Sequence, residues 1–576
     1  MPLPRPRTTH ARAWAILAAA FALLAIAGSA VLARAAQGAG SQKNVVFILT
    51  DDMTTSELSA MPNVQSLLAG HGTSFNEAYV SFPLCCPSRA TMMSGQYMHN
   101  HNVRGNFPPN GSWIRFIPHE TNDLPVWLQD NGYYNVHIGK YMNGYPTGTS
   151  AYPPPHTDNF PVPLGWDEWY GKVSEDALYF NYQLIEKTGP DVVPHLTFYG
   201  DQPTDYQTDV FADRAVNFVH DSGVAKQPFW LNLWFNSPHG PFDPAPRDLF
   251  RLSGTPIAKL PGFNEKDITD KPKWIRKQAK KRITKKQAAL IDNERRRQEE
   301  QLISVDQAVG KLVQTLQDKG ILDDTYIIFS SDNGFFRGEH RIATGKYLPY
   351  DPASRVPLII RGPGIPAGGV SNELVWNGDI TQTILQIASG SLDDSLDGRS
   401  LLPFAQNPAL RSTRPVLLEG DTGPGGTGAE SAQSASARAR EARVHVEGKQ
   451  GVKNLEQEPD AIKSATNTDS APAYRSIRTD RYEYTLYANG QSELYDMKLD
   501  PAQLHSLAAD PRYRYVRQWL YTQLVPLSAC AGPSCRVELG PDPAPLPKSA
   551  LKPKSKKNGK GKKEPPASGK KPSPKT

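Results

Sequence analysis

The residues best suited to do chemistry lie in one short stretch, residues 81–91. Two adjacent cysteines, Cys85 and Cys86, are followed by Pro87 and, two residues later, by Arg89. Proline suits the first turn of a helix, where its missing N–H costs nothing. A helix starting here would direct free N–H groups and a positive dipole end at whatever lies beside Cys85, with Arg89 one turn further on. The pattern is typical of a reactive group that faces an anion, but a loop with two buried cysteines would also produce it.

Polar residues also follow several stretches that are typical of buried strands. The continuous apolar run 44–49 ends in Thr50, Asp51 and Asp52. Buried carboxylates are costly unless they are paired or hold a cation, although an aspartate here could simply cap a helix. Four more residues follow the predicted strands 133–138, 229–235 and 325–329 in the same way: Lys140, His239, Asp332 and Asn333. Ligands bind beyond the carboxyl ends of strands in open α/β sheets, so we expect one common site.

The order of the predicted elements indicates the fold class. Helical periodicity and apolar runs alternate along the chain, with predicted helices at 122–131, 206–219 and 302–316 and a further strand at 356–360. This alternation predicts a layered α/β/α domain with a large, mostly parallel sheet. Two short strands, 475–478 and 482–487, and a helix at 513–524 predict a smaller C-terminal α+β subdomain with an antiparallel sheet.

Composition narrows the class of protein. A chain of 576 residues can bury a large core, and its formal net charge of +6 is small for this size. Much of the excess lies in the Lys-rich tail after Pro547, so nucleic-acid binding is not expected. Cys530 and Cys535 could close a small disulfide loop in an exported protein. No Cys/His set has zinc-finger spacing.

The N-terminus predicts export. A basic flank, an apolar run over residues 13–32 and a small-x-small site predict a signal peptide over 1–35, with an uncleaved anchor as the alternative. We therefore expect a secreted or cell-surface protein that contacts the membrane only if this segment is retained. The remaining predicted units are a catalytic domain (41–410), a C-terminal subdomain (411–540) with a disordered insertion near 420–470, and a basic disordered tail (541–576).

A highly charged run covers residues 266–300. Its first part is dense in lysine and arginine, and its later part is mixed. The default interpretation is a solvated helix face. The alternative is a basic rim that attracts a polyanionic substrate.

The motif Cys85-x-Pro87-x-Arg89 resembles the maturation signature of type I sulfatases, which belong to the alkaline phosphatase superfamily. The run from Cys85 to His101 is most similar to the branch of N-acetylglucosamine-6-sulfatases and extracellular heparan endosulfatases. The resemblance implies hydrolysis of sulfate esters, with a sulfated carbohydrate or an aryl sulfate as the substrate. The expected substrate is a 6-O-sulfated N-acetylglucosamine-type sugar of a glycan. In this family a formylglycine-generating enzyme converts the first cysteine to formylglycine, whose hydrate is the nucleophile.

The resemblance also implies roles for the residues at the strand ends. An oxygen-rich ligand set suits a hard cation such as Ca²⁺ or Mg²⁺, and the family pattern places one divalent cation, usually Ca²⁺, on modified Cys85 with Asp51, Asp52, Asp332 and Asn333. Arg89 would hold the gem-diol. Lys140 and Lys346 would contact sulfate oxygens. His239 would protonate the leaving alcohol with help from Lys346, while Asp332 would take the proton of the attacking hydroxyl.

One position departs from the family pattern. The usual phrase Gly-Lys-Trp-His is Gly139-Lys140-Tyr141-Met142 here, so the histidine thought to assist sulfate elimination is replaced, as in the glucosamine-6-sulfatase branch. Candidate substitutes are His99, His101 and His137, although lone histidines are more often structural. Two other functions stay open: a phosphonate or phosphodiester hydrolase of the same superfamily, and a non-enzymatic surface protein whose basic tail binds polyanions.

Overall fold

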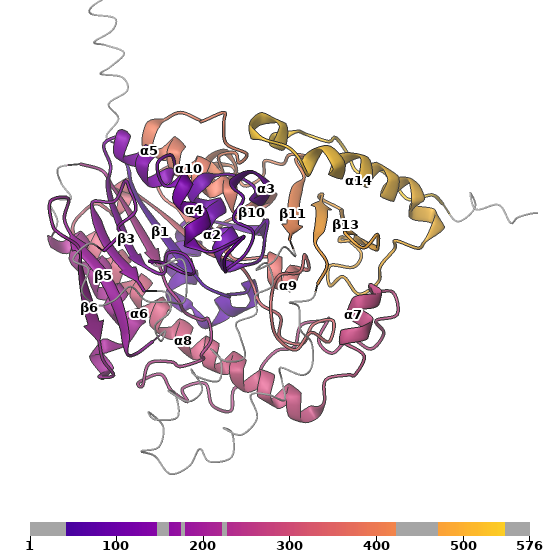
Figure 1. Cartoon of the computed structure of the whole chain (residues 1–576), viewed down its shortest axis with the longest axis horizontal. Coiled ribbons are helices and arrows are strands. Elements are labelled where there is room, and N and C mark those ends of the chain that lie inside the picture. Colours follow the sequence, from indigo (N-terminus) through magenta and orange to yellow (C-terminus); the bar gives the residue numbers. More distant parts are fainter. Residues whose placement is uncertain (1–41, 147–159, 174–178, 222–226, 422–470, 548–576) are drawn as a thin grey trace, which may run out of the picture.

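The computed structural model of the chain describes residues 42–146, 160–173, 179–221, 227–421 and 471–547 (Figure 1). The predicted signal or anchor, the predicted insertion and most of the predicted tail lie outside these residues. Within the described part of the chain, no helix combines the length and the apolar character needed to cross a membrane.

A ten-stranded sheet forms the larger part of the molecule, in the order β10-β2-β9-β8-β1-β7-β3-β4-β5-β6. The strands are β1 (Asn44–Thr50), β2 (Thr73–Tyr79), β3 (Tyr134–Gly139), β4 (Glu168–Lys172), β5 (Tyr182–Thr188), β6 (His195–Tyr199), β7 (Phe229–Trp234), β8 (Thr325–Ser331), β9 (Leu358–Arg361) and β10 (Gly369–Trp376). The central strands β8, β1, β7, β3 and β4 run parallel. Only β9 and β5 oppose them, so the prediction of a mostly parallel sheet is confirmed.

Helices cover both faces of this sheet (Figure 1). The α-helices of the described residues, including those of the C-terminal part, are α2 (Cys85–Ser94), α3 (Met98–His101), α4 (Trp113–Phe116), α5 (Leu124–Asp130), α6 (Gln207–Asp221), α7 (Lys273–Gln278), α8 (Lys285–Asp318), α9 (Asp351–Ser354), α10 (Gly378–Ser389), α11 (Leu402–Gln406) and α14 (Arg514–Leu527). One apolar core joins the sheet to α2, α5 and α10, and another joins it to α6 and α8. All seven residues of β1 are buried, as expected for a strand covered on both faces.

The predicted helix at 302–316 is the second half of α8, a 34-residue helix. Thr284 caps its first turn by accepting a hydrogen bond from the Gln287 amide. The charged run 266–300 therefore includes α7 and the first half of α8. The interpretation as a solvated face is only partly right, because Arg295, Glu299 and Glu300 are buried.

The C-terminal part contains a separate four-stranded antiparallel sheet, in the order β11-β12-β13-β14. Its strands are β11 (Val416–Gly420), β12 (Tyr474–Arg478), β13 (Tyr482–Tyr487) and β14 (Ser492–Asp496). Helix α14 packs on this sheet through Val516, Leu520 and Leu524. The predicted α+β unit is thus confirmed, and Cys530 and Cys535 form a disulfide.

Candidate active site

Helix α2 begins at Cys85, directly after Leu84 in extended conformation. The Ser88 amide donates to the Leu84 carbonyl at 3.0 Å, which closes the first turn around Pro87. All ten residues of α2 are buried, and Gly95 ends the helix at φ 67°, a left-handed conformation that glycine adopts readily. The Cys85 side chain therefore lies at the positive end of a helix dipole.

The carboxyl ends of four central strands meet in front of this helix. Thr50 of β1 pairs with Ser331 of β8, so the residues that follow, Asp51 and Asp332, lie side by side. The Asp332 amide donates to the Thr50 carbonyl at 3.0 Å. The Asp51 amide donates to the Ser237 carbonyl at 3.1 Å, which joins the segment after β7. Lys140 follows the last residue of β3, and its amide donates to the carbonyl of Trp234 at the end of β7.

Arg89 ties these strand ends to α2. Its guanidinium donates to the Asp332 carboxylate at 2.8 Å, to the Asp51 carboxylate at 3.2 Å and to the Lys140 carbonyl at 2.8 Å. The group is fully buried and lies 5.1 Å from the ring centre of Trp234. Burial alone would lower the pKa of Arg89, but Asp332 and Asp51 raise it, so the guanidinium stays charged.

Two lysines, with Arg89, balance the negative charge of the three carboxylates in the cluster. The Lys140 ammonium donates to Asp51, and the Lys346 ammonium donates to Asp52 and lies 2.9 Å from the Cys85 sulfur. Burial works against both charges, but the carboxylates raise the pKa of each lysine above its ordinary value. Burial and then Asp51 raise the pKa of the Cys85 thiol to about 12, so unmodified Cys85 is a thiol near neutral pH.

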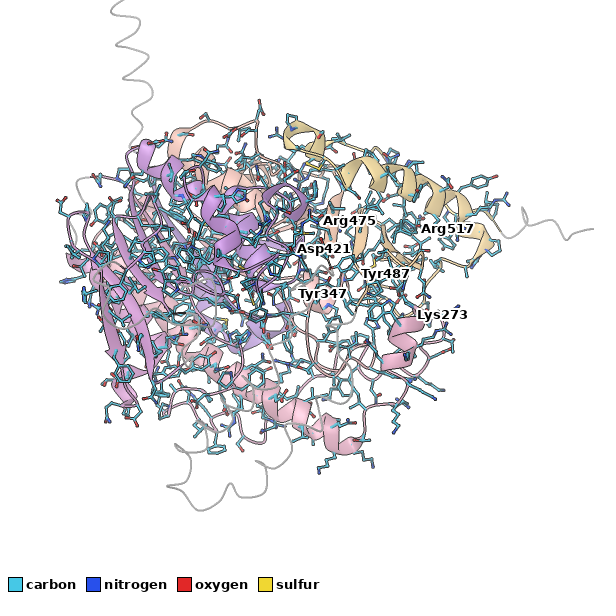
Figure 2. The ribbon with its side chains drawn as sticks, viewed as in Figure 1. Lys273, Tyr347, Asp421, Arg475, Tyr487 and Arg517 are labelled. Carbon is cyan, nitrogen blue, oxygen red and sulfur yellow. A yellow bond between two sulfur atoms is a disulfide. The ribbon has the colours of Figure 1, made fainter. Side chains whose placement is uncertain are left out.

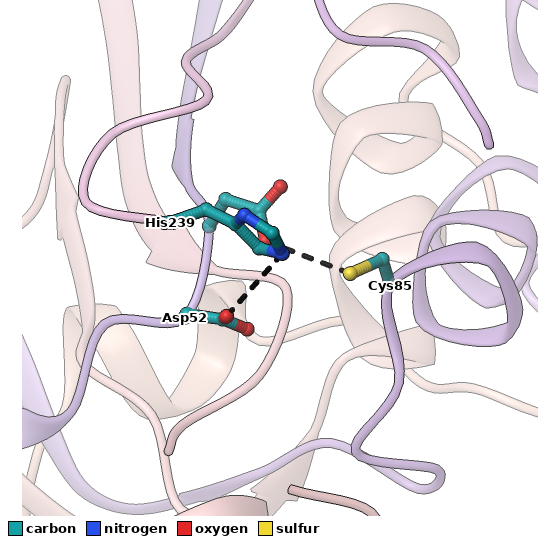
Figure 3. Close-up of side chains that lie close together, drawn as sticks. Asp52, Cys85 and His239 are labelled. Carbon is teal, nitrogen blue, oxygen red and sulfur yellow. Dashed lines mark hydrogen bonds and ion pairs between the residues drawn. The ribbon is translucent and has the colours of Figure 1, made fainter. Parts of the chain in front are cut away.

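His239 approaches the cluster from the segment after β7 (Figure 3). Its Nε2 lies 3.6 Å from the Asp52 carboxylate, and its Nδ1 is 2.6 Å from the Gly240 carbonyl, to which it donates. The Tyr179 hydroxyl donates to the His239 carbonyl at 2.6 Å and holds the backbone. Nε2 is therefore the ring nitrogen available to a bound molecule.

The donor set fits a divalent cation. One ligand atom each from Asp51, Asp52, Cys85 and His239 lies within 4.8 Å of the others. Asn333 donates its amide N–H to Asp52, while its Oδ1 is buried and has no hydrogen-bond partner among the described residues. A buried, unpaired amide oxygen beside carboxylates is the chemistry that Ca²⁺ and Mg²⁺ prefer. Asp52 has φ 67°, an uncommon conformation for a non-glycine residue that is often found at functional sites.

All nine site residues expected from the sequence thus lie in one hydrogen-bonded or ion-paired cluster: Asp51, Asp52, Cys85, Arg89, Lys140, His239, Asp332, Asn333 and Lys346. The three histidines considered as substitutes for the missing one have partners outside this cluster. His99 bonds Glu419, His101 bonds Thr91, and His137 bonds Asn232. Burial also lowers the pKa of His137 to about 3.

Two supporting residues have no counterpart in the sequence predictions. Arg337 donates to the Gln298 side-chain oxygen at 2.7 Å, and Gln298 donates to the Pro238 carbonyl at 3.2 Å. Both side chains are buried, and they connect the segment after Asn333 to the backbone beside His239. A signal existed for Gln298, because it is a polar residue four positions before Leu302 on the buried stripe of α8.

Comparison with solved structures places the fold. A protein solved in complex with its substrate D-glucosamine-2-N,6-O-disulfate superimposes with a TM-score of 0.63 at 21% identity, over 84% of this chain and 97% of that chain. The match shows the fold, a layered α/β/α domain of the alkaline-phosphatase-like kind.

Sequence comparison then gives the family. The sulfatase family model matches residues 43–391, so the chain belongs to the sulfatase family. Human N-acetylglucosamine-6-sulfatase is 31% identical over 86% of this chain and 87% of its own length. Extracellular sulfatase Sulf-1 homologues of Caenorhabditis elegans and Drosophila melanogaster are 34% and 33% identical over 63% and 65% of this chain. This chain spans 49% and 32% of their lengths.

Proposed function

We propose that this chain hydrolyses sulfate esters, using a formylglycine made from Cys85 and a bound divalent cation, Ca²⁺ or Mg²⁺. The observation that carries the proposal is the meeting of Cys85, at the start of α2, with three cationic side chains and three carboxylates. The proposed substrate is a 6-O-sulfated N-acetylglucosamine-type sugar of a glycan. The human relative that bears that activity in its name aligns over most of both chains.

The cationic side chains suit the charge of the reaction. A sulfate ester carries negative charge on its non-bridging oxygens, and more develops on the leaving oxygen, so the site must supply positive charge and a proton. Lys140 and Lys346 would bind the non-bridging oxygens. Arg89 would hold Asp51 and Asp332 in place, because one guanidinium already donates to both.

The family implies two further groups, a formylglycine and a divalent cation, which residues of this cluster would hold. The formylglycine hydrate supplies a hydroxyl nucleophile, and the cation supplies charge that offsets the anionic ester. Asp51, Asp52, Asp332 and Asn333 would hold the cation, and Asp332 would also accept the proton of the attacking hydroxyl.

His239 would deliver the proton to the leaving alcohol. Its Nδ1 is committed to the Gly240 carbonyl, which leaves Nε2 toward the cluster. Met142 is buried in the apolar core, and the three candidate histidines, His99, His101 and His137, bond residues outside the cluster.

Two measurements test this proposal. Mass spectrometry of the peptide that contains Cys85 should show a mass about 18 Da below that of the cysteine peptide, as conversion of thiol to aldehyde requires. Matured protein should release sulfate from N-acetylglucosamine 6-sulfate, and the Cys85→Ala variant should not. Release only from 2-O- or 4-O-sulfated sugars would refute the 6-O assignment. Faster turnover of an aryl phosphodiester than of an aryl sulfate would favour the phosphonate or phosphodiester hydrolase.

Export is part of the same proposal. The Sulf-1 relatives are extracellular by name, and the Cys530–Cys535 disulfide suits an oxidising compartment. Maturation would then require a formylglycine-generating enzyme in the host. We expect the mature protein in the medium or at the cell surface. N-terminal sequencing of the exported protein would distinguish cleavage after the predicted signal from a retained anchor.

A further inference from the structure

Residues 266–286 form a segment of high positive charge, here called the basic segment. It contains ten lysines and arginines and only two acidic residues, Asp267 and Asp270. The segment includes α7 and the first residues of α8. Eight of its cationic side chains are exposed: Lys266, Lys273, Lys277, Lys280, Lys281, Arg282, Lys285 and Lys286. Figure 2 labels Lys273 on α7, below the C-terminal sheet in this view.

Most of the exposed lysines of the basic segment are not paired with a carboxylate of the described residues. Among the described residues, six of the exposed lysines have no carboxylate within 4.0 Å: Lys266, Lys273, Lys277, Lys280, Lys281 and Lys285. Other lysines of the chain are paired, such as Lys43 with Asp324 and Lys259 with Asp292. Like charges close together repel, and an extended anion would remove that repulsion.

The basic segment is fixed to the loop that leads to the active site. Arg341 donates to the carbonyls of Glu265 and Lys266, both at 2.7 Å, and its other N–H groups approach the carbonyls of Ala279 and Lys280. One buried guanidinium thus holds both ends of the stretch that contains α7. The Asn264 amide adds a 2.7 Å hydrogen bond to the Gly338 carbonyl. The charges are therefore presented on an ordered backbone.

The loop of residues 336–346 limits the distance between Arg341 and Lys346 of the active site. Phe336 donates to the Gly345 carbonyl at 2.7 Å, which closes the base of the loop beside Lys346. Arg341 precedes Lys346 by five residues, and five extended residues span at most about 17 Å. The carbonyls of Glu265 and Lys266 are thus bound by a residue whose backbone lies within about 17 Å of Lys346, the lysine beside Cys85.

We propose that the basic segment is a docking surface for the polyanionic chain of a sulfated polysaccharide, one sugar of which occupies the active site. This inference rests on the proposed sulfatase function and extends it from a single sugar to a polymer. A monosaccharide sulfate fills only the site at Cys85. A polymer whose sulfates repeat along its length would also meet the unpaired lysines, and its local concentration would rise through long-range attraction.

The test compares polymer with monomer. The charge-reversal variant K273E/K277E/K280E/K281E should raise KM for sulfate release from heparin by about tenfold or more at low salt. Its kcat/KM for N-acetylglucosamine 6-sulfate should stay within about twofold of wild type. A substrate with one sulfate is attracted less strongly by the lysines than a polymer with many. Added NaCl should raise the wild-type KM for heparin steeply and the variant KM weakly.

Milder variants guard against misfolding. K273Q/K277Q should show a smaller increase in KM for heparin, whereas K311Q/K319Q, near the other end of α8, should show none. Equal changes for heparin and monosaccharide, or no change for either, would overturn the proposal.

Direct binding separates this inference from the enzymatic one. Heparin titrated into the Cys85→Ala protein should bind tightly with the lysines present and at least about tenfold more weakly with them reversed. Equal heparin affinity would refute the docking surface even in an active sulfatase. Lysine-dependent binding without sulfate release from any substrate would refute the sulfatase function instead. Stronger binding of a DNA duplex than of heparin at equal ionic strength would also overturn the assignment to a sulfated polysaccharide.

Discussion

Two clusters of buried charge in this molecule have opposite characters. In the first, the Asp379 carboxylate at the start of α10 accepts two hydrogen bonds from Arg414 and one from each of the Trp376 and Arg399 amides. Each oxygen of Asp379 thus has two donors. This cluster is closed, because its carboxylate has no capacity left for a ligand.

The active-site cluster is open by comparison. Three carboxylates and three cations share one small volume, the Asn333 oxygen has no partner among the described residues, and Asp52 has a left-handed backbone. The pKa values of Asp51 and Asp332 are shifted in opposite directions, down for Asp51 and up for Asp332. Burial raises the pKa of both, but the surrounding cations outweigh burial at Asp51, while Asp51 itself raises the pKa of Asp332 further. Buried acceptor oxygens with unused binding capacity mark function here, and a buried carboxylate whose two oxygens each have two donors marks structure.

The largest expected effect is at the open cluster. His239→Ala should lower kcat for a sugar sulfate by about 10² to 10⁴-fold, because an alkoxide leaves slowly without a proton donor. The same variant should lower kcat much less for an aryl sulfate with an acidic phenol, which needs little protonation. Steady-state kinetics on both substrates checks the difference. An equal loss on both would mean that His239 does not donate the proton.

At the closed cluster the effect should fall on stability instead. Arg414→Ala should lower the free energy of unfolding by about 3–5 kcal/mol, because it leaves the buried Asp379 charge without its partner. Urea unfolding measures the change, and activity per folded molecule should stay near wild type. The double variant R414M/D379L should recover most of the loss. If it stays as unstable as the single variant, the pair matters through packing and not through charge.

Glu120 is a third kind of buried carboxyl group, which has no cationic side chain within 4.0 Å in the described part of the chain. Burial raises the pKa of Glu120 from 4.5 to about 7, although hydrogen bonds from Trp113 and Tyr141 work in the opposite direction. The folded state therefore holds this proton more tightly than the unfolded state. Its stabilising effect is complete below about pH 4.5 and is lost as pH rises through about 7.

The Glu120→Gln variant isolates this contribution. The difference in unfolding free energy between wild type and E120Q should shift by about 1–3 kcal/mol in favour of the variant between pH 4.5 and 7.5. Urea unfolding at several pH values gives the curve. A difference independent of pH would show that the pKa of Glu120 is the same in the folded and unfolded states.

The sequence predicted the open cluster better than the closed one. Strands β1, β7 and β8 are mostly apolar stretches that polar residues follow closely, so both the strand and the position of its functional side chain could be read locally. Strand β2 could not be read in this way, because its burial follows neither strict alternation nor a continuous run. The pairing of Asp379 with Arg414, 35 residues apart, has no local signature at all.

Gln298 combines features of the two kinds of cluster, because it is buried and hydrogen-bonded but supports the active site. Its substitution should give the smallest change in catalytic rate of the variants considered. Its side chain joins Arg337 to the Pro238 carbonyl, so it positions His239 without contacting substrate. Gln298→Glu keeps the acceptor for Arg337 but loses the donor to Pro238, and should lower kcat about threefold to tenfold, the equivalent of one hydrogen bond of about 1 kcal/mol. The loss should appear with a sugar sulfate and be nearly absent with an acidic aryl sulfate. The matched control is Gln301→Glu, whose side chain bonds the Pro241 carbonyl beyond His239 and should alter the ratio between the two substrates less. A uniform loss on both substrates, or a larger change in thermal stability than in that ratio, would make Gln298 a structural residue like Arg414.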